Sequence, residues 1–124
     1  MKRETNGIAE IFCINLKPGT GTAFNKIYIE QSLPLQKRWK VDILAFGPSL
    51  HDEDSYLVVR RYKDLADRQQ SQDSFYGSDE WKKGPREAIL ALIENYTTVV
   101  VPVNAALLEG LKGINLASRK DKES

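Results

Sequence analysis

Two adjacent arginines are the first candidates for chemistry in this sequence. Arg60 and Arg61 lie in a stretch of β-branched and aromatic residues that predicts a strand. Adjacent strand residues point to opposite faces, so only one of the two can face the interior. A guanidinium there could bind a carboxylate or a phosphate through two parallel hydrogen bonds. A structural ion pair with Glu30, Asp64 or Glu94 is the more common role for an arginine at a strand end.

Aromatic side chains could line a pocket beside that arginine. Concave apolar sites with a few polar groups are the usual sites for small molecules, although packing in a core is the more common role for such residues. The pocket stays a candidate because Arg68, Gln69 and Gln72 occupy inward positions of the neighbouring predicted helix, where an apolar core would not accommodate them. The aromatic candidates are Tyr28, Phe75, Tyr76 and Trp81. The candidate ligand-binding residues are Tyr28, Arg60, Arg61, Arg68, Tyr76 and Trp81.

The remaining reactive side chains have ordinary structural explanations. His51 precedes three acidic residues, which could tune it as a general acid or base, but a solvated loop is the more common explanation. The spacing of those acids does not match a calcium loop, and we expect no metal site. Cys13 is expected to be a small buried hydrophobe. The glycines at 19 and 21 lack the lysine of a phosphate-binding loop, so we expect a turn and a helix cap there. We expect no cofactor, and we assign no catalytic residue.

The elements that position these residues follow one another as strand, helix, strand, strand, helix, strand. Strands are predicted over residues 8–17, 41–49, 56–62 and 96–103. The first helix begins near Thr20 or Thr22. Pro34 should kink it or end it near Leu33, and a helix can resume from there through Trp39. Asp64 and Ser78 can cap helices, and Pro85 starts a last one with a stripe of apolar residues. That stripe contains Ala88, Ile89, Leu92 and Ile93.

This order predicts a fold of the α+β class. It is the ferredoxin-like β-α-β-β-α-β pattern, which has an antiparallel four-stranded sheet with helices on one face. The other face would still be apolar, because Val58 and Tyr62 alternate with Leu57 and Val59, and Val99 and Val101 alternate with Val100. A large exposed apolar face is a liability, so we expect a homodimer through the sheet faces. A short helix from Asn104 to Leu111 either closes over a cleft or packs on the partner subunit.

Length and composition suit one domain. The chain has 124 residues, with 18 basic and 17 acidic side chains, which does not favour nucleic acid as a partner. No apolar stretch is long enough for a membrane span. We expect no signal peptide, because residues 1–7 are polar and charged, and the single cysteine fits a reducing, cytoplasmic location. We expect a flexible N-terminus at 1–7, the domain at 8–103, a short helical extension at 104–117 and a charged disordered tail at 118–124.

Four segments together carry a family resemblance. They are residues 8–19, residues 33–35 with 45–49, residues 56–62, and the Phe-Tyr-Gly-Ser run at 75–78 that leads through Trp81 into Gly-Pro-Arg at 84–86. The last is the most specific. Across about residues 8 to 103 the sequence resembles a bacterial member of the NIPSNAP family, within the dimeric α/β-barrel superfamily. The resemblance implies the ferredoxin-like fold and a dimer whose two sheets form a barrel.

The resemblance leaves the activity open. The wider superfamily includes cofactor-free monooxygenases, haem-degrading enzymes, aldoxime- and muconolactone-type enzymes and non-catalytic members, so the fold alone cannot decide. The haem-degrading members use a helical histidine, whereas His51 lies in a predicted loop. The scarcity of tunable groups favours a protein that binds a small molecule or partner in the cleft between helices and sheet.

The alternative is a cofactor-free enzyme, monooxygenase- or isomerase-like, acting on a small hydrophobic or aromatic substrate. Arg60 or Arg61 would then hold an anion, Tyr28 or Tyr76 would donate a hydrogen bond, and Trp81 would form a packing wall.

Overall fold

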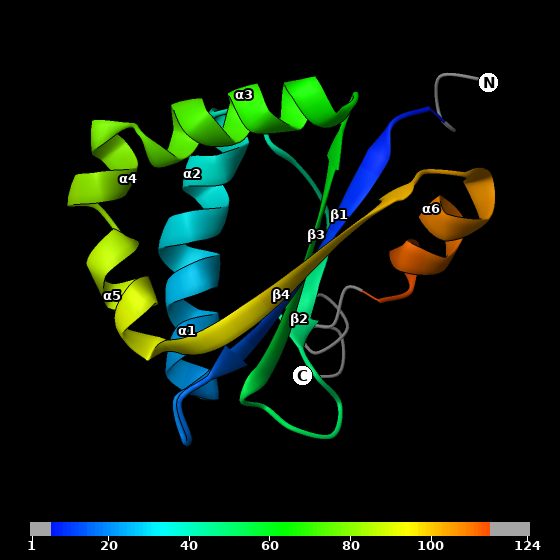
Figure 1. Ribbon diagram of the computed structural model, residues 1–124. Coiled ribbons are helices and arrows are strands. Elements are labelled where there is room, and N and C mark those ends of the chain that lie inside the picture. The colour runs from blue at the N-terminus through cyan, green and yellow to red at the C-terminus, as the bar shows by residue number, and fades with distance from the viewer. Residues whose placement is uncertain (1–5, 115–124) are drawn as a thin grey trace.

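A four-stranded antiparallel sheet is the frame of this computed structural model, which describes residues 6–114. The strand order is β2-β3-β1-β4. The strands are β1 (Ile8–Leu16), β2 (Asp42–Pro48), β3 (Ser55–Tyr62) and β4 (Ile93–Pro102). The helical segments from α1 to α5 stack on one face of this sheet (Figure 1). The predicted α+β class and ferredoxin-like order are confirmed.

The alternation of residues along the central strand β1 decides which side chains meet the helices. Phe12, Ile14 and Leu16 pack in the cluster on the helix side, whereas Ala9 and Ile11 pack in a second cluster on the outer side. This period of two is the reason for the apolar residues on both faces of the strand. The same alternation carries Glu10 to the helix side.

The first helical region continues past Pro34 to Arg38, so the predicted resumption is confirmed and the alternative of an end near Leu33 was wrong. α1 (Gly21–Ile27) continues through the π-helical turn η2 (Tyr28–Ser32) into α2 (Leu33–Arg38). Proline has no N–H, and its ring would clash with the carbonyl four residues back in a regular α-helix. The wider turn just before Pro34, where the Leu33 N–H donates to the carbonyl of Tyr28, changes that spacing and lets the helix continue.

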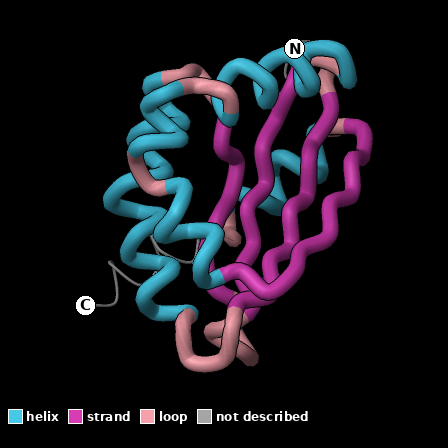
Figure 2. The backbone as a smooth tube through the Cα atoms, turned by 60° about the vertical axis from the view of Figure 1, so that its left-hand side comes forward, coloured by secondary structure: helices cyan, strands magenta, loops and turns pink. Residues whose placement is uncertain are grey.

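The second helical region is divided into α3 (Leu65–Tyr76), α4 (Asp79–Lys83) and α5 (Arg86–Leu92). Asp64 caps α3 by accepting from the Asp67 N–H, and Ser78 caps α4 by accepting from the Trp81 N–H. One expectation was wrong here, because Ile93 begins β4 instead of extending the apolar stripe of α5. Figure 2 shows these helices gathered over one side of the sheet.

The outer face of the sheet is partly covered by α6 (Ala105–Lys112), which lies opposite the other helices (Figure 1). Leu111 of α6 belongs to a buried cluster with Ala9, Ala45 and Val59 from the sheet. It therefore packs on its own sheet and covers part of the face that was predicted to be open, so the prediction that it closes over the cleft between helices and sheet was wrong. Packing on a partner subunit stays a prediction. Asn104 caps it by accepting from the Leu107 N–H.

The part of the outer face beside β4 stays open in the single chain. Val99 is 51% exposed, and the thiol-bearing Cys13 is exposed, so the prediction of a buried cysteine was wrong. The expected N-terminal segment 1–7 lies largely, and the tail 118–124 entirely, outside the described residues. None of the helices within residues 6–114 is long and apolar enough to cross a membrane.

Candidate functional site

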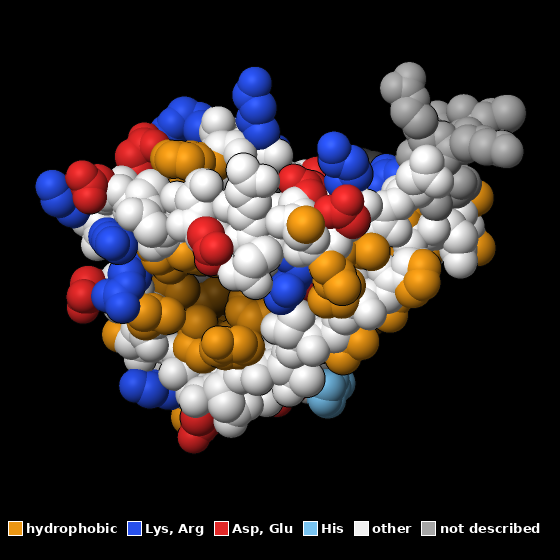
Figure 3. Space-filling model, turned by 45° about the horizontal axis from the view of Figure 1, so that its top comes forward, with side chains coloured by type: hydrophobic (Ala, Val, Ile, Leu, Met, Phe, Trp, Pro, Cys, Tyr) orange, Lys and Arg blue, Asp and Glu red, His pale blue; other side chains and the backbone are white. Residues whose placement is uncertain are grey.

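A cavity of about 400 Å³ lies between the helix side of the sheet and the helices. This volume falls in the range of small-molecule sites, about 300–1,000 Å³. The space-filling view shows a hollow lined by hydrophobic side chains on this side of the molecule (Figure 3). Its apolar wall includes Phe12, Ile14, Val58, Trp81, Ile89 and Ile93. Its polar lining is Glu10, Ser32, Gln36, Arg60, Arg68 and Gln72, with the hydroxyls of Tyr28 and Tyr76.

The strand register separates the polar end of the cavity from the apolar end. Glu10 is paired with Arg60 across β1 and β3, and the next inward pair along the two strands is Phe12 with Val58. On the other side of β1, Phe12 is paired with Thr98. The lining therefore changes from charged to apolar within one step of two residues along each strand.

Glu10 and Arg60 form a buried ion pair at the polar end. Arg60 Nε donates to Glu10 Oε1 at 2.8 Å, and Nη2 lies 2.6 Å from the same oxygen, with side-chain exposures of only 5% and 2%. Burial alone would raise the pKa of Glu10, but the charge of Arg60 and the hydrogen bonds donated by its neighbours hold that pKa below its usual value. Glu10 is therefore a carboxylate at neutral pH.

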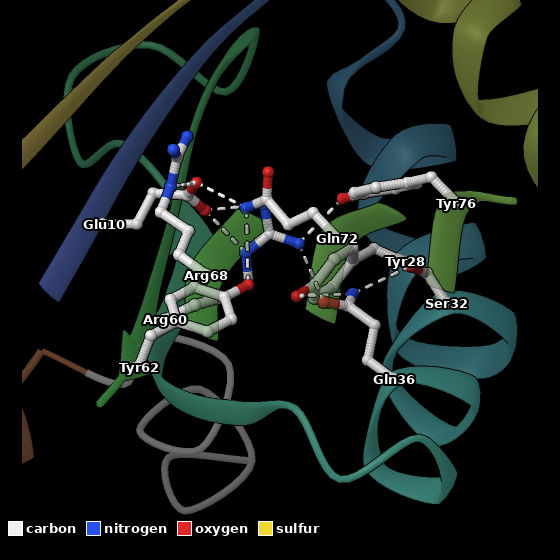
Figure 4. Close-up of polar contacts among 9 residues, drawn as sticks. All are labelled: Glu10, Tyr28, Ser32, Gln36, Arg60, Tyr62, Arg68, Gln72 and Tyr76. Atoms are coloured by element: carbon white, nitrogen blue, oxygen red, sulfur yellow. Dashed lines mark hydrogen bonds and ion pairs between the residues drawn. The ribbon is translucent and has the colours of Figure 1, made fainter. Parts of the chain in front are cut away.

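Two residues of α3 complete the shell around Glu10. Arg68 Nε donates to Glu10 Oε2 at 2.7 Å, and Gln72 Nε2 donates to the same oxygen at 2.6 Å (Figure 4). Each carboxylate oxygen thus accepts from two donor atoms. The terminal nitrogens of Arg68 have no hydrogen-bond partner within residues 6–114, and this side chain is 23% exposed. The polar middle of α3 is explained by these contacts.

Arg60 connects the carboxylate to the first helical region. Its Nη1 donates to the hydroxyl of Tyr76 at 2.7 Å and to Gln36 Oε1 at 3.2 Å. Gln36 Nε2 donates in turn to Ser32 Oγ at 3.0 Å and to the hydroxyl of Tyr28 at 3.3 Å. The three hydroxyl oxygens act as acceptors in these bonds, so each keeps its own hydrogen for donation.

The π-helical turn and the start of α2 supply the residues of this chain. Tyr28, Ser32 and Gln36 follow one another at intervals of four residues, and all three are buried. Residues four apart share a helix face, and here that face meets the cavity. Burial raises the pKa of Tyr28 far above its usual value, so its hydroxyl stays protonated.

The predicted site residues separate into two groups. Five of the six line the cavity together: Tyr28, Arg60, Arg68, Tyr76 and Trp81. Arg61 lies on the opposite face of β3, where its Nη2 donates to the carbonyl of Asn6 at 2.6 Å. Gln69 does not contribute either, because its amide donates to Asp73 on the exposed side of α3.

Sequence reasoning missed Glu10, Ser32 and Gln36. The expected ion-pair partners of the strand arginine were wrong, since Arg60 pairs with Glu10. One signal could have identified Glu10: it is the only charged residue among the inward positions of the first strand, and an antiparallel neighbour carries an arginine. Ser32 and Gln36 gave no such signal, because polar residues of a helix usually lie on its solvated face.

The acidic loop after β2 has a structural role. Asp54 accepts from the backbone N–H groups of Gly19 at 2.9 Å and Gly21 at 2.8 Å, which supports the start of α1. Gly21 is required there, because a Cβ would lie 1.8 Å from the carbonyl of Glu53. His51 is exposed, and its Nδ1 lies 2.7 Å from Ser49 Oγ. No cluster of three or more potential metal ligands occurs within the described part of the chain.

Comparisons with known proteins identify the fold. No family model and no curated protein matches the sequence. A NIPSNAP-like domain protein from Burkholderia xenovorans is 16% identical, with 82% of this chain and 88% of that chain covered and a TM-score of 0.74. A NIPSNAP family protein from Agrobacterium tumefaciens is 18% identical, with 81% and 90% covered and a TM-score of 0.73.

A structure described as a putative antibiotic biosynthesis monooxygenase from Nitrosomonas europaea is also similar. It is 13% identical, with 76% of this chain and 95% of that chain covered and a TM-score of 0.58. At such identities the likeness concerns the fold. The chain has the ferredoxin-like α+β fold found in solved structures of NIPSNAP-family proteins.

Proposed function

We propose that this NIPSNAP-like protein binds a small molecule in the cavity between its helices and its sheet. The observation that carries the proposal is the joining of an apolar wall to a preorganised polar network in one cavity of about 400 Å³. A buried ion pair is costly to desolvate, and well-packed apolar residues are often at least as stable in its place. The Glu10–Arg60 pair is therefore better explained by a ligand than by stability.

The ionisable groups of the cavity favour binding over proton transfer. A general acid or base works best with a pKa near the operating pH. Glu10 is shifted down and Tyr28 is shifted up, so both move away from neutrality. Both oxygens of Glu10 are also occupied by donors. These groups can hold and orient a ligand, whereas a proton transfer through them would be slow.

The proposal includes a homodimer formed through the open part of the outer sheet face. Ile11 on β1 is paired with Val99 on β4, and Cys13 is next to them on the same face. A second copy of the chain would cover these residues together with Leu57 and Val101. We place this dimer in the cytoplasm, where an exposed thiol stays reduced.

A cofactor-free enzyme is the second candidate. The hydroxyls of Tyr28 and Tyr76 and the guanidinium of Arg60 act together in one network, as donors that stabilise an oxyanion do. The similarity to structures described as putative antibiotic biosynthesis monooxygenases points the same way. A bound compound that is recovered unchanged after incubation with the protein in air would favour binding over this alternative.

Uptake of the neutral dye Nile red tests the binding function. Thr98 lines the cavity opposite Phe12, and the variant Thr98→Phe places an aromatic ring in that space on a strand that tolerates it. We expect the wild-type protein to increase the dye fluorescence and Thr98→Phe to lose this increase while keeping its circular dichroism spectrum. Equal dye binding by both proteins would contradict the proposed site.

A further inference from the structure

We propose that the ligand is an amphipathic anion, with a carboxylate head at Arg68 and an apolar chain or ring against the apolar wall of the cavity. This inference rests on the proposed binding function and adds the chemical class of the ligand. It follows from four observations: the charge balance of the cavity, the terminal nitrogens of Arg68, the small number of free acceptors, and the change of the lining from charged to apolar along the strands.

The charged side chains that line the cavity do not balance. They are one carboxylate, Glu10, and two guanidiniums, Arg60 and Arg68. The guanidinium of Arg60 donates to Glu10, Gln36 and Tyr76, and its side chain is only 5% exposed. The side chain of Arg68 is 23% exposed and reaches the surface. One positive charge is therefore left over, and it belongs to the guanidinium that an incoming molecule meets. A singly charged anion would neutralise it.

Arg68 is already oriented to receive such a head group. Its Nε–H donates to Glu10, which fixes the plane of the guanidinium, and its terminal nitrogens extend away from Glu10 (Figure 4). Those nitrogens have no hydrogen-bond partner within residues 6–114. Two parallel N–H groups match the two oxygens of a carboxylate, and a guanidinium held in place loses little conformational freedom on binding.

The network offers donors to a ligand and few acceptors. Glu10 Oε1 accepts from two nitrogens of Arg60, and Oε2 accepts from Arg68 and Gln72. A cationic ligand would need this carboxylate and would have to displace one of those donors. The hydroxyls of Tyr28, Ser32 and Tyr76 instead keep a hydrogen to donate. Acceptor-rich, negatively charged groups fit this pattern.

The remainder of the ligand must be apolar. From the Glu10–Arg60 pair, the strands lead to Phe12 and Val58, and the helix residues Trp81 and Ile89 add further apolar lining. An alkyl chain or aromatic ring against these residues would gain about 25 cal/mol for each Å² of apolar surface removed from water. A fatty or aryl monocarboxylate combines both parts.

The test compares octanoate with 1-octanol, which has the same chain without the charge. Trp81 lines the cavity and is 6% exposed, whereas Trp39 lies outside the lining and is 37% exposed. The variant Trp39→Phe therefore leaves one tryptophan that reports on the cavity. We expect octanoate to change the Trp81 emission with a Kd at least about tenfold lower than that of 1-octanol, equal to about 1.4 kcal/mol.

Substitutions at position 68 assign this preference to one side chain. In the Trp39→Phe background, Arg68→Gln should remove the preference for octanoate. Arg68→Lys keeps the positive charge but lacks the two parallel N–H donors of a guanidinium, so it should retain part of the preference. Arg86→Gln is the matched control. Arg86 lies on α5 outside the cavity lining, contacts Glu87, and should not affect either Kd.

The outcomes separate the two proposals. Equal Kd values for octanoate and 1-octanol, or a preference that persists in Arg68→Gln, would overturn the anionic class and leave the binding function intact. No response to either compound would overturn the anionic class, and a lack of Nile red uptake in addition would reject the binding function as well. If Arg68→Gln does not fold, the preference of the Trp39→Phe protein should decrease with added KCl, and a preference independent of salt would overturn the inference.

Discussion

Glu10 and Arg60 stand directly opposite each other on β1 and β3, fifty residues apart in the chain, with Arg60 Nε 2.8 Å from Glu10 Oε1. The pair lies on the helix side of the sheet, next to the apolar pair of Phe12 and Val58. Every other polar contact of the cavity continues from one of these two side chains. The polar end of the candidate site is thus organised by one cross-strand pair.

Removing one member of this pair should strongly destabilise the protein. We expect Arg60→Met to reduce the free energy of unfolding by about 3–5 kcal/mol, because Glu10 would be left buried with fewer compensating charges. The double variant Glu10→Met/Arg60→Met should recover most of this loss, since no buried charge remains. Urea unfolding followed by circular dichroism measures both values. A loss below about 1 kcal/mol in Arg60→Met would show that the pair is not buried in solution.

The carboxylate of Glu10 should make stability depend on acid. Its pKa in the folded protein lies below the ordinary value of 4.5, so the unfolded chain takes up the proton first as the pH falls. The stabilisation is fully present above pH 4.5 and is lost as the pH falls through the folded pKa. Urea midpoints between pH 6 and pH 3 should decrease less steeply for Glu10→Gln than for the wild type. Parallel curves would contradict the lowered pKa.

The hydroxyl of Tyr76 should matter more for ligand binding than that of Tyr62. Tyr76 accepts from Arg60 at 2.7 Å and lines the cavity, whereas Tyr62 accepts from Gln72 at 3.4 Å and lies outside the lining. We expect Tyr76→Phe to weaken octanoate binding at least about tenfold, because the carboxylate would lose the hydrogen that the Tyr76 hydroxyl keeps for donation, and a hydrogen bond to a charged group contributes about 1.5–3 kcal/mol. Tyr62→Phe is the matched control and should bind normally. Equal losses in the two variants would indicate a general effect on packing.

A charge on the open part of the outer sheet face should dissociate the dimer. Val99→Lys places an ammonium at a position that a second copy would bury, and this is costly. Size-exclusion chromatography with light scattering should show two chains for the wild type and one for Val99→Lys. Leu65→Lys makes the same change at an exposed leucine on α3 and should remain dimeric. A dimeric Val99→Lys protein would place the interface elsewhere.

The single thiol should report on the same interface. Cys13 is exposed in the single chain, on the face that the dimer would cover. We expect it to react slowly with a disulfide reagent in the wild-type protein and at least tenfold faster in Val99→Lys. The reaction is followed by the release of the coloured thiolate. Fast reaction in the wild-type dimer would mean that the second copy does not cover Cys13.

Much of this structure could be predicted from the sequence, because it depends on local patterns. Alternation and turn residues predicted four strands, and the polar stripe of Arg68 and Gln72 indicated that α3 faces something other than an apolar core. What could not be predicted depends on contacts between distant residues. The partner of Arg60 is fixed by the register between β1 and β3, which the sequence of neither strand determines alone.

Two helical features also depend on tertiary context. Pro34 predicts a kink or an end of the helix, and the structure contains a π-helical turn just before it, after which the helix continues. α6 has an apolar face that several surfaces could bury, and only the three-dimensional structure assigns it to its own sheet.

The central claim is that the cavity holds a small molecule, and native mass spectrometry of protein freshly purified from cells tests it most directly. We expect the mass of two chains plus a small adduct for the wild type, and the mass of two chains alone for Thr98→Phe, whose new ring fills the cavity. The same adduct on both proteins would place the compound outside the cavity. Adduct-free wild-type protein that also takes up neither Nile red nor octanoate would contradict the claim.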